Sequence, residues 1–177
     1  MSTPLFKECV SWLLSPAIEG GYQANPDDTG NWTSGQKGLG ELRGTKYGIS
    51  AASFPDVDIK NLSPIKAADL YEEHYWKPYG LDLLPPGLAL AVFDAAVNQG
   101  QNRAVRWLQR VLGVNADNVV GPDTARAAAQ NPKKTLREYL RLRMMNYVMN
   151  DRFKIFGADW VDRLLLCHEK ALELQEG

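Results

Sequence analysis

The sequence is poor in cysteine and histidine, and each shortage excludes a class of site. Among its 177 residues, the only cysteines are Cys9 and Cys167 and the only histidines are His74 and His168. Two cysteines cannot build a disulfide framework or a four-cysteine zinc site, and a catalytic zinc usually takes two or three histidines. We therefore expect no metal and no cofactor, folding in a reducing compartment, and buried thiols without a catalytic role.

A strong net charge and long apolar runs are also absent. The 20 Lys and Arg residues nearly balance the 21 Asp and Glu residues, which gives a formal net charge of −1 and argues against nucleic-acid binding by the whole chain. No segment approaches the roughly 18 apolar residues of a membrane helix, so we expect no stable membrane insertion. The first twenty residues lack a basic leader before an apolar core, which predicts synthesis in the cytoplasm.

The residues that are present predict a mainly α-helical domain. The hydrophobic fraction of 45% and the charged fraction of 23% are ordinary for a soluble globular protein, and 177 residues suit one domain. Apolar residues at helical spacing, prolines at first helical positions and glycines at helix ends predict about seven or eight helices. The expected helices are 4–14, a short one at 48–53, 64–76, 86–98, 102–112, 122–130, 132–149 and 159–173.

Residues 22–45 have a different composition. They contain five glycines, which predicts loop and turn with a small irregular hairpin. Long loops with little regular structure are usually functional or disordered, and the apolar anchors Trp32, Leu39 and Leu42 favour a functional loop. We expect a single domain over 1–177, in which 1–60 form an irregular loop lobe and 61–177 form a helical lobe.

Three polar residues in and around this loop form a candidate catalytic set. Glu19 stands at the C-terminal end of a helical turn, where the helix dipole and apolar neighbours would favour its protonated form. Such a carboxyl can act as a general acid. Asp28 lies in a polar turn that would keep it ionised, and the hydroxyl of Thr45 would orient a water. One apolar acid and one solvated carboxylate are the pair that cleaves glycosidic bonds.

Each member of the set also has a structural interpretation. Glu19 would then be a surface acid, Asp28 a turn former and Thr45 a loop hydroxyl. Asp27 is an alternative to Asp28 as the second carboxylate. Glu19 at a helix C-terminus would be mildly unfavourable for stability, and this placement itself indicates a function.

Five further residues are candidates for substrate binding. The aromatic rings would stack on sugars, although aromatic side chains in a small domain more often fill the core. The two amide side chains would bind the acetamido groups of a glycan, although Asn98 would equally suit the end of its own helix. The five candidates are Tyr22, Trp32, Tyr47, Asn98 and Gln99.

Three motifs follow one another in the first part of the chain, and these are Glu19–Tyr22, Asn25–Gly30 and Gly44–Ile49. In this order they resemble glycoside hydrolase family 108, the phage and prophage N-acetylmuramidases with a lysozyme-like fold. Downstream segments resemble the peptidoglycan domain attached in that family, and these are Tyr75–Trp76, Phe93–Gly100, Trp107–Gln109 and Val120–Thr124. The chain departs from the family pattern at Asn25, where aspartate is common, and in the long connection from 31 to 43.

The resemblance implies a lysozyme that hydrolyses the β-1,4 bond between N-acetylmuramic acid and N-acetylglucosamine in peptidoglycan glycan strands. It matches Glu19 to the family's catalytic glutamate, and Asp28 and Thr45 to the aspartate and threonine of the later motifs. It also implies a phage endolysin for host lysis, which accumulates in the host cytoplasm and needs a separately encoded holin to reach the wall in the periplasm. We expect a monomer. A lytic transglycosylase and a non-catalytic peptidoglycan-binding module are the alternatives.

Positive charge is concentrated within 133–154. We interpret this segment as a solvated helix face, with Leu136, Leu140, Met144 and Val148 turned inward. The alternative is a basic surface that attracts anionic cell-envelope polymers. The basic residues are Lys133, Lys134, Arg137, Arg141, Arg143, Arg152 and Lys154.

Overall fold

The computed structural model describes residues 2–19 and 21–176. Gly20, one of the glycines that mark the predicted helix ends, lies outside the described residues. The chain forms two compact units. One is continuous, Val10–Glu72, and the other combines Met1–Cys9 with Glu73–Gly177. We call them the loop unit and the helical unit. The boundary at Glu72 lies later in the chain than residue 60, where the two lobes were predicted to divide.

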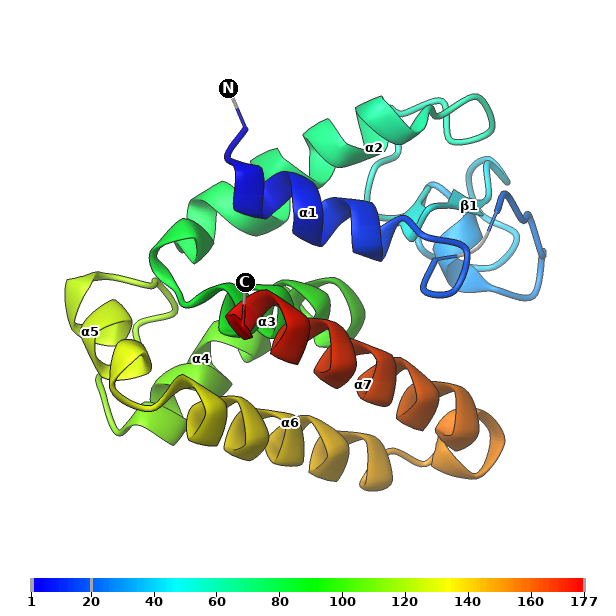
Figure 1. The fold of residues 1–177 in the computed structure, drawn as a ribbon. Helices are drawn as coiled ribbons and strands as arrows, with labels where there is room; N and C mark the ends of the chain where they lie inside the picture. Colours follow the sequence, from blue (N-terminus) through cyan, green and yellow to red (C-terminus); the bar gives the residue numbers. More distant parts are fainter. Residues whose placement is uncertain (1, 20, 177) are drawn as a thin grey trace. The chain divides into compact units, whose positions relative to one another are not determined.

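The loop unit contains little regular structure, as its glycine content predicts. Its elements are the end of α1 (Pro4–Leu13), the 3-10 turn η1 (Thr29–Asn31), β1 (Thr45–Lys46), β2 (Ile49–Ser50) and α2 (Pro64–Tyr71). The two strands are antiparallel, with Thr45 opposite Ser50 (Figure 1). The short helix expected at 48–53 is therefore wrong, because residues 47 and 48 form the hairpin turn instead.

Helices make up most of the helical unit. The stretch after α2 continues as a π-helix over Glu72–Trp76, so the helix predicted at 64–76 is one helical segment with a change of geometry. The following helices are α3 (Pro86–Gln99), α4 (Gln101–Leu112), α5 (Pro122–Gln130), α6 (Pro132–Val148) and α7 (Phe153–Glu176). Together with α1 and α2, they make seven α-helices in the described residues, which confirms the mainly helical fold class.

Helix α3 is the centre of the helical unit. It packs against α4, α6 and α7, and its residues from Gly87 to Ala96 are all buried (Figure 1). Gly87 permits a close approach of α7, because a Cβ at this position would lie 2.2 Å from the carbonyl oxygen of Ala171. The near-continuous apolar run of α3 therefore reflects burial on all sides rather than on a single face.

Helix α7 begins at Phe153, earlier than the predicted start at 159. The amides of Ile155 and Phe156 donate to the carbonyl of Arg152 and so begin the helix. Tyr147 stacks on Trp160 with ring centroids 5.1 Å apart, and Phe156 lies 6.0 Å from the same ring. This aromatic cluster holds the first turns of α7 against the end of α6.

The predicted orientation of α6 is wrong at two positions. Arg143 was expected on the basic surface but is fully buried, and its Nη2 lies 2.6 Å from Oδ2 of Asp94 on α3. Arg163 on α7 lies 2.8 Å from the other oxygen of the same carboxylate. Val148 was expected to point inward but is 50% exposed. An ion pair inside the core allows an arginine to occupy the inward stripe of a helix.

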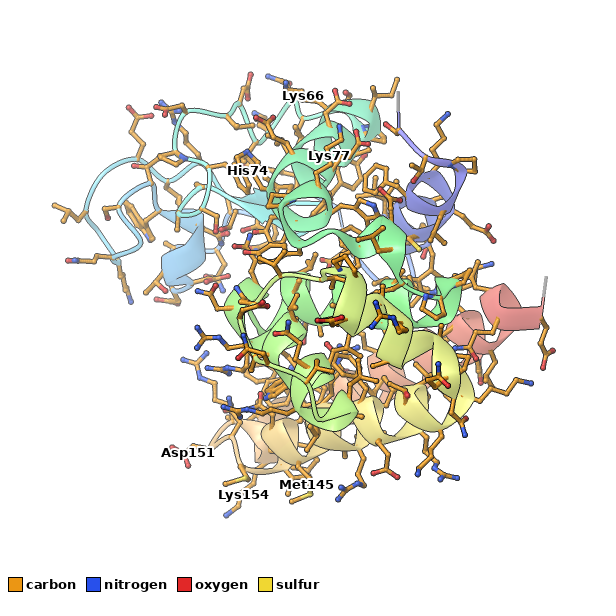
Figure 2. All side chains as sticks on the ribbon, turned by 90° about the vertical axis from the view of Figure 1, so that its left-hand side faces the viewer. Lys66, His74, Lys77, Met145, Asp151 and Lys154 are labelled. Carbon is orange, nitrogen blue, oxygen red and sulfur yellow. The ribbon has the colours of Figure 1, made fainter. Side chains whose placement is uncertain are left out.

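Exposed side chains cover the turn between α6 and α7. Met145, Asp151 and Lys154 extend from the ribbon at the same corner of Figure 2. Met145 is 47% exposed and Met149 is 79% exposed, so this end of the basic segment also carries apolar surface. In the described part of the chain, no helix combines the length and the apolar character needed to cross a membrane.

Candidate active site

Glu19 lies a few residues after Leu13, where α1 ends, on a short turn that the sequence predicts. The amides of Ile18 and Glu19 both donate to the carbonyl of Ser15, so a separate helical turn follows the end of α1. The side chain of Glu19 is half-buried. Its carboxyl lies against the hairpin, because a Cβ added to Gly48 would lie only 2.8 Å from Oε2 of Glu19.

The hairpin turn beside Glu19 has an unusual backbone. Tyr47 has φ 54° and Gly48 has φ 73°, so both central residues are in the left-handed region that a type I′ turn requires. This conformation is strained for tyrosine. The hydroxyl of the buried Tyr71 on α2 donates a 2.7 Å hydrogen bond to the carbonyl of Tyr47 and so fixes the turn. The same hydroxyl would lie 2.6 Å from a Cβ at position 48.

Asp28 is exposed and caps the 3-10 turn η1. Its Oδ1 accepts from the amide of Gly30 at 2.9 Å, and its Oδ2 lies 3.5 Å from Nε2 of Gln23. The neighbouring Asp27 is engaged differently. Lys37 binds its carboxylate, and this hydrogen bond and charge together hold the pKa of Asp27 below its ordinary value. The two adjacent acids therefore have distinct environments.

A chain of side-chain hydrogen bonds connects Asp28 to Thr45. Oγ1 of Thr45 donates to Oδ1 of Asn31 at 2.6 Å. Nδ2 of the fully buried Asn31 donates to Oε1 of Gln23 at 2.8 Å, and Gln23 reaches Asp28 through its Nε2. The structure therefore brings the predicted Asp28 and Thr45 into one network.

Gln23 and Asn31 are the members of this network that sequence reasoning missed. Both lie in a segment without helical or strand periodicity, so no pattern predicts which of its polar side chains is buried. The available signal was the position of Asn31, within the turn that follows Asp28 and at the start of the long connection from 31 to 43.

The aromatic candidates lie in the loop unit and differ in exposure. Tyr22 is 39% exposed and its ring covers Gly44, where a Cβ would lie 2.8 Å from Cε2 of the tyrosine. Trp32 is partly buried, and its Nε1 donates to the carbonyl of Pro26 at 2.9 Å. Nζ of Lys46 lies 5.3 Å from the ring centre of Tyr47. Tyr22 also lines an open cavity of about 420 Å³ with Leu42, Arg43, Asp56, Asp58, Ile59 and Lys60.

Asn98 and Gln99 belong to the helical unit and have partners there. The hydroxyl of Tyr147 donates to Oδ1 of Asn98. Nε of Arg143 donates to Oε1 of Gln99 at 2.8 Å, and Nε2 of Gln99 donates to the carbonyl of Arg143 at 3.3 Å. These bonds connect the end of α3 to α6. The role of the two amides in binding acetamido groups stays a prediction.

Possible metal ligands do not gather in the described residues. No group of three or more His, Cys, Asp and Glu side chains in residues 2–19 and 21–176 could hold an ion. Cys9 and Cys167 are both buried free thiols, as the sequence predicts.

Comparison with known proteins identifies both halves of the chain. Residues 15–100 match the family model of glycosyl hydrolase 108. The first part of the chain is therefore similar to glycosyl hydrolase 108 proteins. Residues 103–152 match the model described as a predicted peptidoglycan domain. No curated protein matches the chain.

A solved structure supports the same conclusion. The structure of Brucella abortus SagA is 29% identical, with a TM-score of 0.80 and coverage of 97% of this chain and 96% of that chain. The predicted family resemblance and the lysozyme-like fold are confirmed. The residues that match the glycosyl hydrolase 108 model include Glu19, Asp28 and Thr45. The matches support a lysozyme-like glycoside hydrolase that acts on peptidoglycan.

Proposed function

We propose that this glycosyl hydrolase 108 protein is an N-acetylmuramidase that uses Glu19 as its proton donor. Its substrate bond is the β-1,4 link between N-acetylmuramic acid and N-acetylglucosamine. The observation that carries the proposal is the position of the Glu19 carboxyl against Gly48 of a hairpin turn that Tyr71 fixes. A half-buried acid on a rigid support suits proton transfer to the leaving oxygen of a sugar.

The fixed turn defines where the acid can reach. Because Gly48 has no side chain, the Glu19 carboxyl can approach the hairpin backbone closely. The hydrogen bond from Tyr71 to the Tyr47 carbonyl limits movement of that backbone. Glu19 would thus present its proton from one direction, and protonating the glycosidic oxygen would make the sugar a better leaving group.

Asp28 is the proposed second carboxylate. Lys37 binds Asp27, whereas Asp28 is exposed and accepts from a backbone amide and, at longer distance, from Gln23. Asp28 would stabilise positive charge on the sugar ring or activate the attacking water. Thr45 would assist through the oxygen of its hydroxyl, since the proton of that hydroxyl is donated to Asn31.

Lysis of purified cell walls tests the assignment. Removing a general acid typically costs about 10²- to 10⁴-fold in rate, so we expect Glu19→Gln to lose at least that much turbidity-clearing activity. Asp28→Asn should also lose activity, while the adjacent Asp27→Asn serves as the matched control and should stay near wild type. Wall lysis by Glu19→Gln at the wild-type rate would contradict the proposal.

Mass spectrometry of the released fragments separates hydrolysis from the alternatives. A muramidase adds water and leaves reducing N-acetylmuramic acid ends. A lytic transglycosylase would leave 1,6-anhydro ends and would keep its activity in Asp28→Ala, because it needs no activated water. A binding module would sediment with walls and release no fragments.

We also propose that the enzyme is a monomeric phage endolysin for host lysis, acting in the periplasm after synthesis in the host cytoplasm. The family resemblance supports this role. Expression alone should leave bacterial cells intact, and co-expression with a holin should lyse them, as culture turbidity would show. Lysis without a holin would contradict the proposed route to the wall.

A further inference from the structure

Helix α4 carries an arginine face with no acidic residue on the helix. Arg103, Arg106 and Arg110 are all exposed and are separated by three and four positions, which places them on one side of the helix. In the part of the chain that the structure describes, none of the three forms an ion pair with a carboxylate. We call these three residues the α4 arginine face.

Other exposed basic residues of the helical unit differ from this face. Arg126 pairs with Asp123 at 3.1 Å, Lys133 pairs with Glu176 at 3.1 Å, and Arg141 pairs with Glu138 at 3.1 Å. Like charges at this helical spacing destabilise a helix, and the three arginines repel one another without compensation. A bound polyanion would remove that repulsion.

The surface at the arginine face is hollowed rather than flat. A cavity of about 240 Å³ is lined by the three arginines together with Asn102 and Trp107. A guanidinium group presents a planar fork of donors that matches a carboxylate. Trp107 is largely buried, and the part of its ring that reaches the cavity adds apolar surface beside the arginines.

Side-chain hydrogen bonds hold the helix that carries the face. The buried Gln109 donates to Oδ1 of Asp117 at 2.7 Å and to the carbonyl of Val119 at 3.0 Å. Nδ2 of Asn118 donates to Oδ1 of Asn102 at 2.8 Å, at the edge of the cavity. On the inner side, Tyr139 donates to the carbonyl of Ala104 at 3.1 Å. The backbone under the arginines is therefore organised before any ligand binds.

We propose that the α4 arginine face binds the free carboxylates of the stem peptides of peptidoglycan. This inference rests on the proposed action on peptidoglycan and names the part of the polymer that the helical unit recognises. In the glycan strand, the lactyl group of N-acetylmuramic acid is joined to the peptide as an amide, so the sugar chain is neutral. The stem peptides carry the carboxylates, and three arginines therefore select the peptide. The face also lies within residues 103–152, the segment that matches the peptidoglycan domain.

Binding of the full chain to two wall preparations tests the proposal. The Glu19→Gln background prevents digestion, and walls are used either intact or after carbodiimide coupling to methylamine has converted the peptide carboxylates into neutral amides. We expect intact walls to retain the protein and amidated walls to retain at least ten times less. The triple variant Arg103→Gln, Arg106→Gln, Arg110→Gln should lose the preference for intact walls. The matched control removes three other exposed charges of the same unit, Arg126→Gln, Lys133→Gln and Lys134→Gln, and should keep it.

Three results would overturn the inference. They are equal retention on amidated walls, an unchanged preference in the α4 triple variant, and equal competition by heparin or DNA, which would show a general anion surface. Cleavage of soluble peptide-free glycan distinguishes this failure from failure of the proposed function. If the enzyme with an intact Glu19 cleaves that glycan and the α4 triple variant does so equally well, the muramidase assignment holds whatever the wall-binding result.

Discussion

At the scale of single residues, the site depends on a glycine and a tyrosine that do no chemistry themselves. Gly48 leaves room for the Glu19 carboxyl, and Tyr71 holds the turn by its bond to the Tyr47 carbonyl. Both act through backbone geometry, since a left-handed turn is stable here only when one residue lacks a Cβ and the other is restrained.

Replacing Gly48 with alanine should damage both stability and activity. The new Cβ would meet Tyr71 and Glu19 in a backbone at φ 73°, so the variant combines backbone strain with a collision. We expect a loss of about 1–3 kcal/mol in the free energy of unfolding and at least a tenfold lower rate of wall lysis. Gly38→Ala is the matched control, because Gly38 has φ 77° with nothing within 4 Å. Equal effects of the two changes would contradict the role of the collision.

Asn31 offers a second test at this scale. Asn31→Ala removes the acceptor of Thr45 and the donor to Gln23 from a fully buried position. We expect a loss of about 1–3 kcal/mol in unfolding free energy and lower activity, since a buried polar network loses its central member. Urea denaturation and turbidity assays measure the two effects. The exposed Asn61→Ala should leave the unfolding free energy and the activity unchanged. If Asn31→Ala also changed neither quantity, the network would be dispensable.

At the scale of elements, three helices meet at one buried carboxylate. Asp94 on α3 contacts Arg143 on α6 and Arg163 on α7. Burial opposes ionisation, but the two arginine charges outweigh it and hold the pKa of Asp94 below its ordinary value. The ion pair fixes how the helices pack, because any other alignment would leave a charge buried without a partner.

Asp94→Asn should destabilise the helical unit strongly. The change leaves the fully buried Arg143 without its counter-charge, and removing one partner of a buried pair typically costs about 3–5 kcal/mol. Urea unfolding monitored by circular dichroism measures the loss. The surface pair offers a control, since Asp123→Asn removes the exposed partner of Arg126 and should leave the midpoint unchanged.

The same carboxylate predicts a dependence of stability on pH. The folded pKa of Asp94 is lowered, so the folded state binds fewer protons than the unfolded state as pH falls. Its contribution is complete above the unfolded pKa of about 3.9 and is lost progressively as pH falls from there through the folded pKa. Unfolding midpoints measured from pH 7 to pH 2 should fall less steeply below pH ~4 in Asp94→Asn than in the wild type. If the unfolding midpoints of the two proteins fell equally steeply with pH, Asp94 would not be the source of this dependence.

At the scale of the whole molecule, the core needs no covalent link. Cys9 and Cys167 are buried free thiols, and burial raises the pKa of each to about 12. Thiolates are the reactive form, so both residues should be inert in the folded protein.

A thiol titration checks this expectation. With a disulfide reagent at pH 8, the folded protein should show almost no reactive thiol, and both thiols should react in urea. Reducing agent should not change the melting temperature. Fast reaction of a thiol in the folded protein would show that the core opens locally around it.

Local chemistry in the sequence was enough to predict most of the helices and the family resemblance. The helix over 122–130 was predicted with its observed limits, because Pro122 occupies its first position and Pro132 begins the next helix. The Glu19 turn and the order of the motifs could also be predicted from the sequence, since both depend on residues close together in the chain. These features use interactions over a few positions, which sequence patterns record.

Only the tertiary structure decided which polar side chains are buried. Periodicity predicted Arg143 at the surface, but its partner Asp94 is far away in the chain, and no local pattern could reveal the pair. Asn31 is buried because Gln23 and Thr45, from separate segments, satisfy its amide. The desolvation of a charge or an amide is offset by specific partners, and folding alone determines where those partners lie.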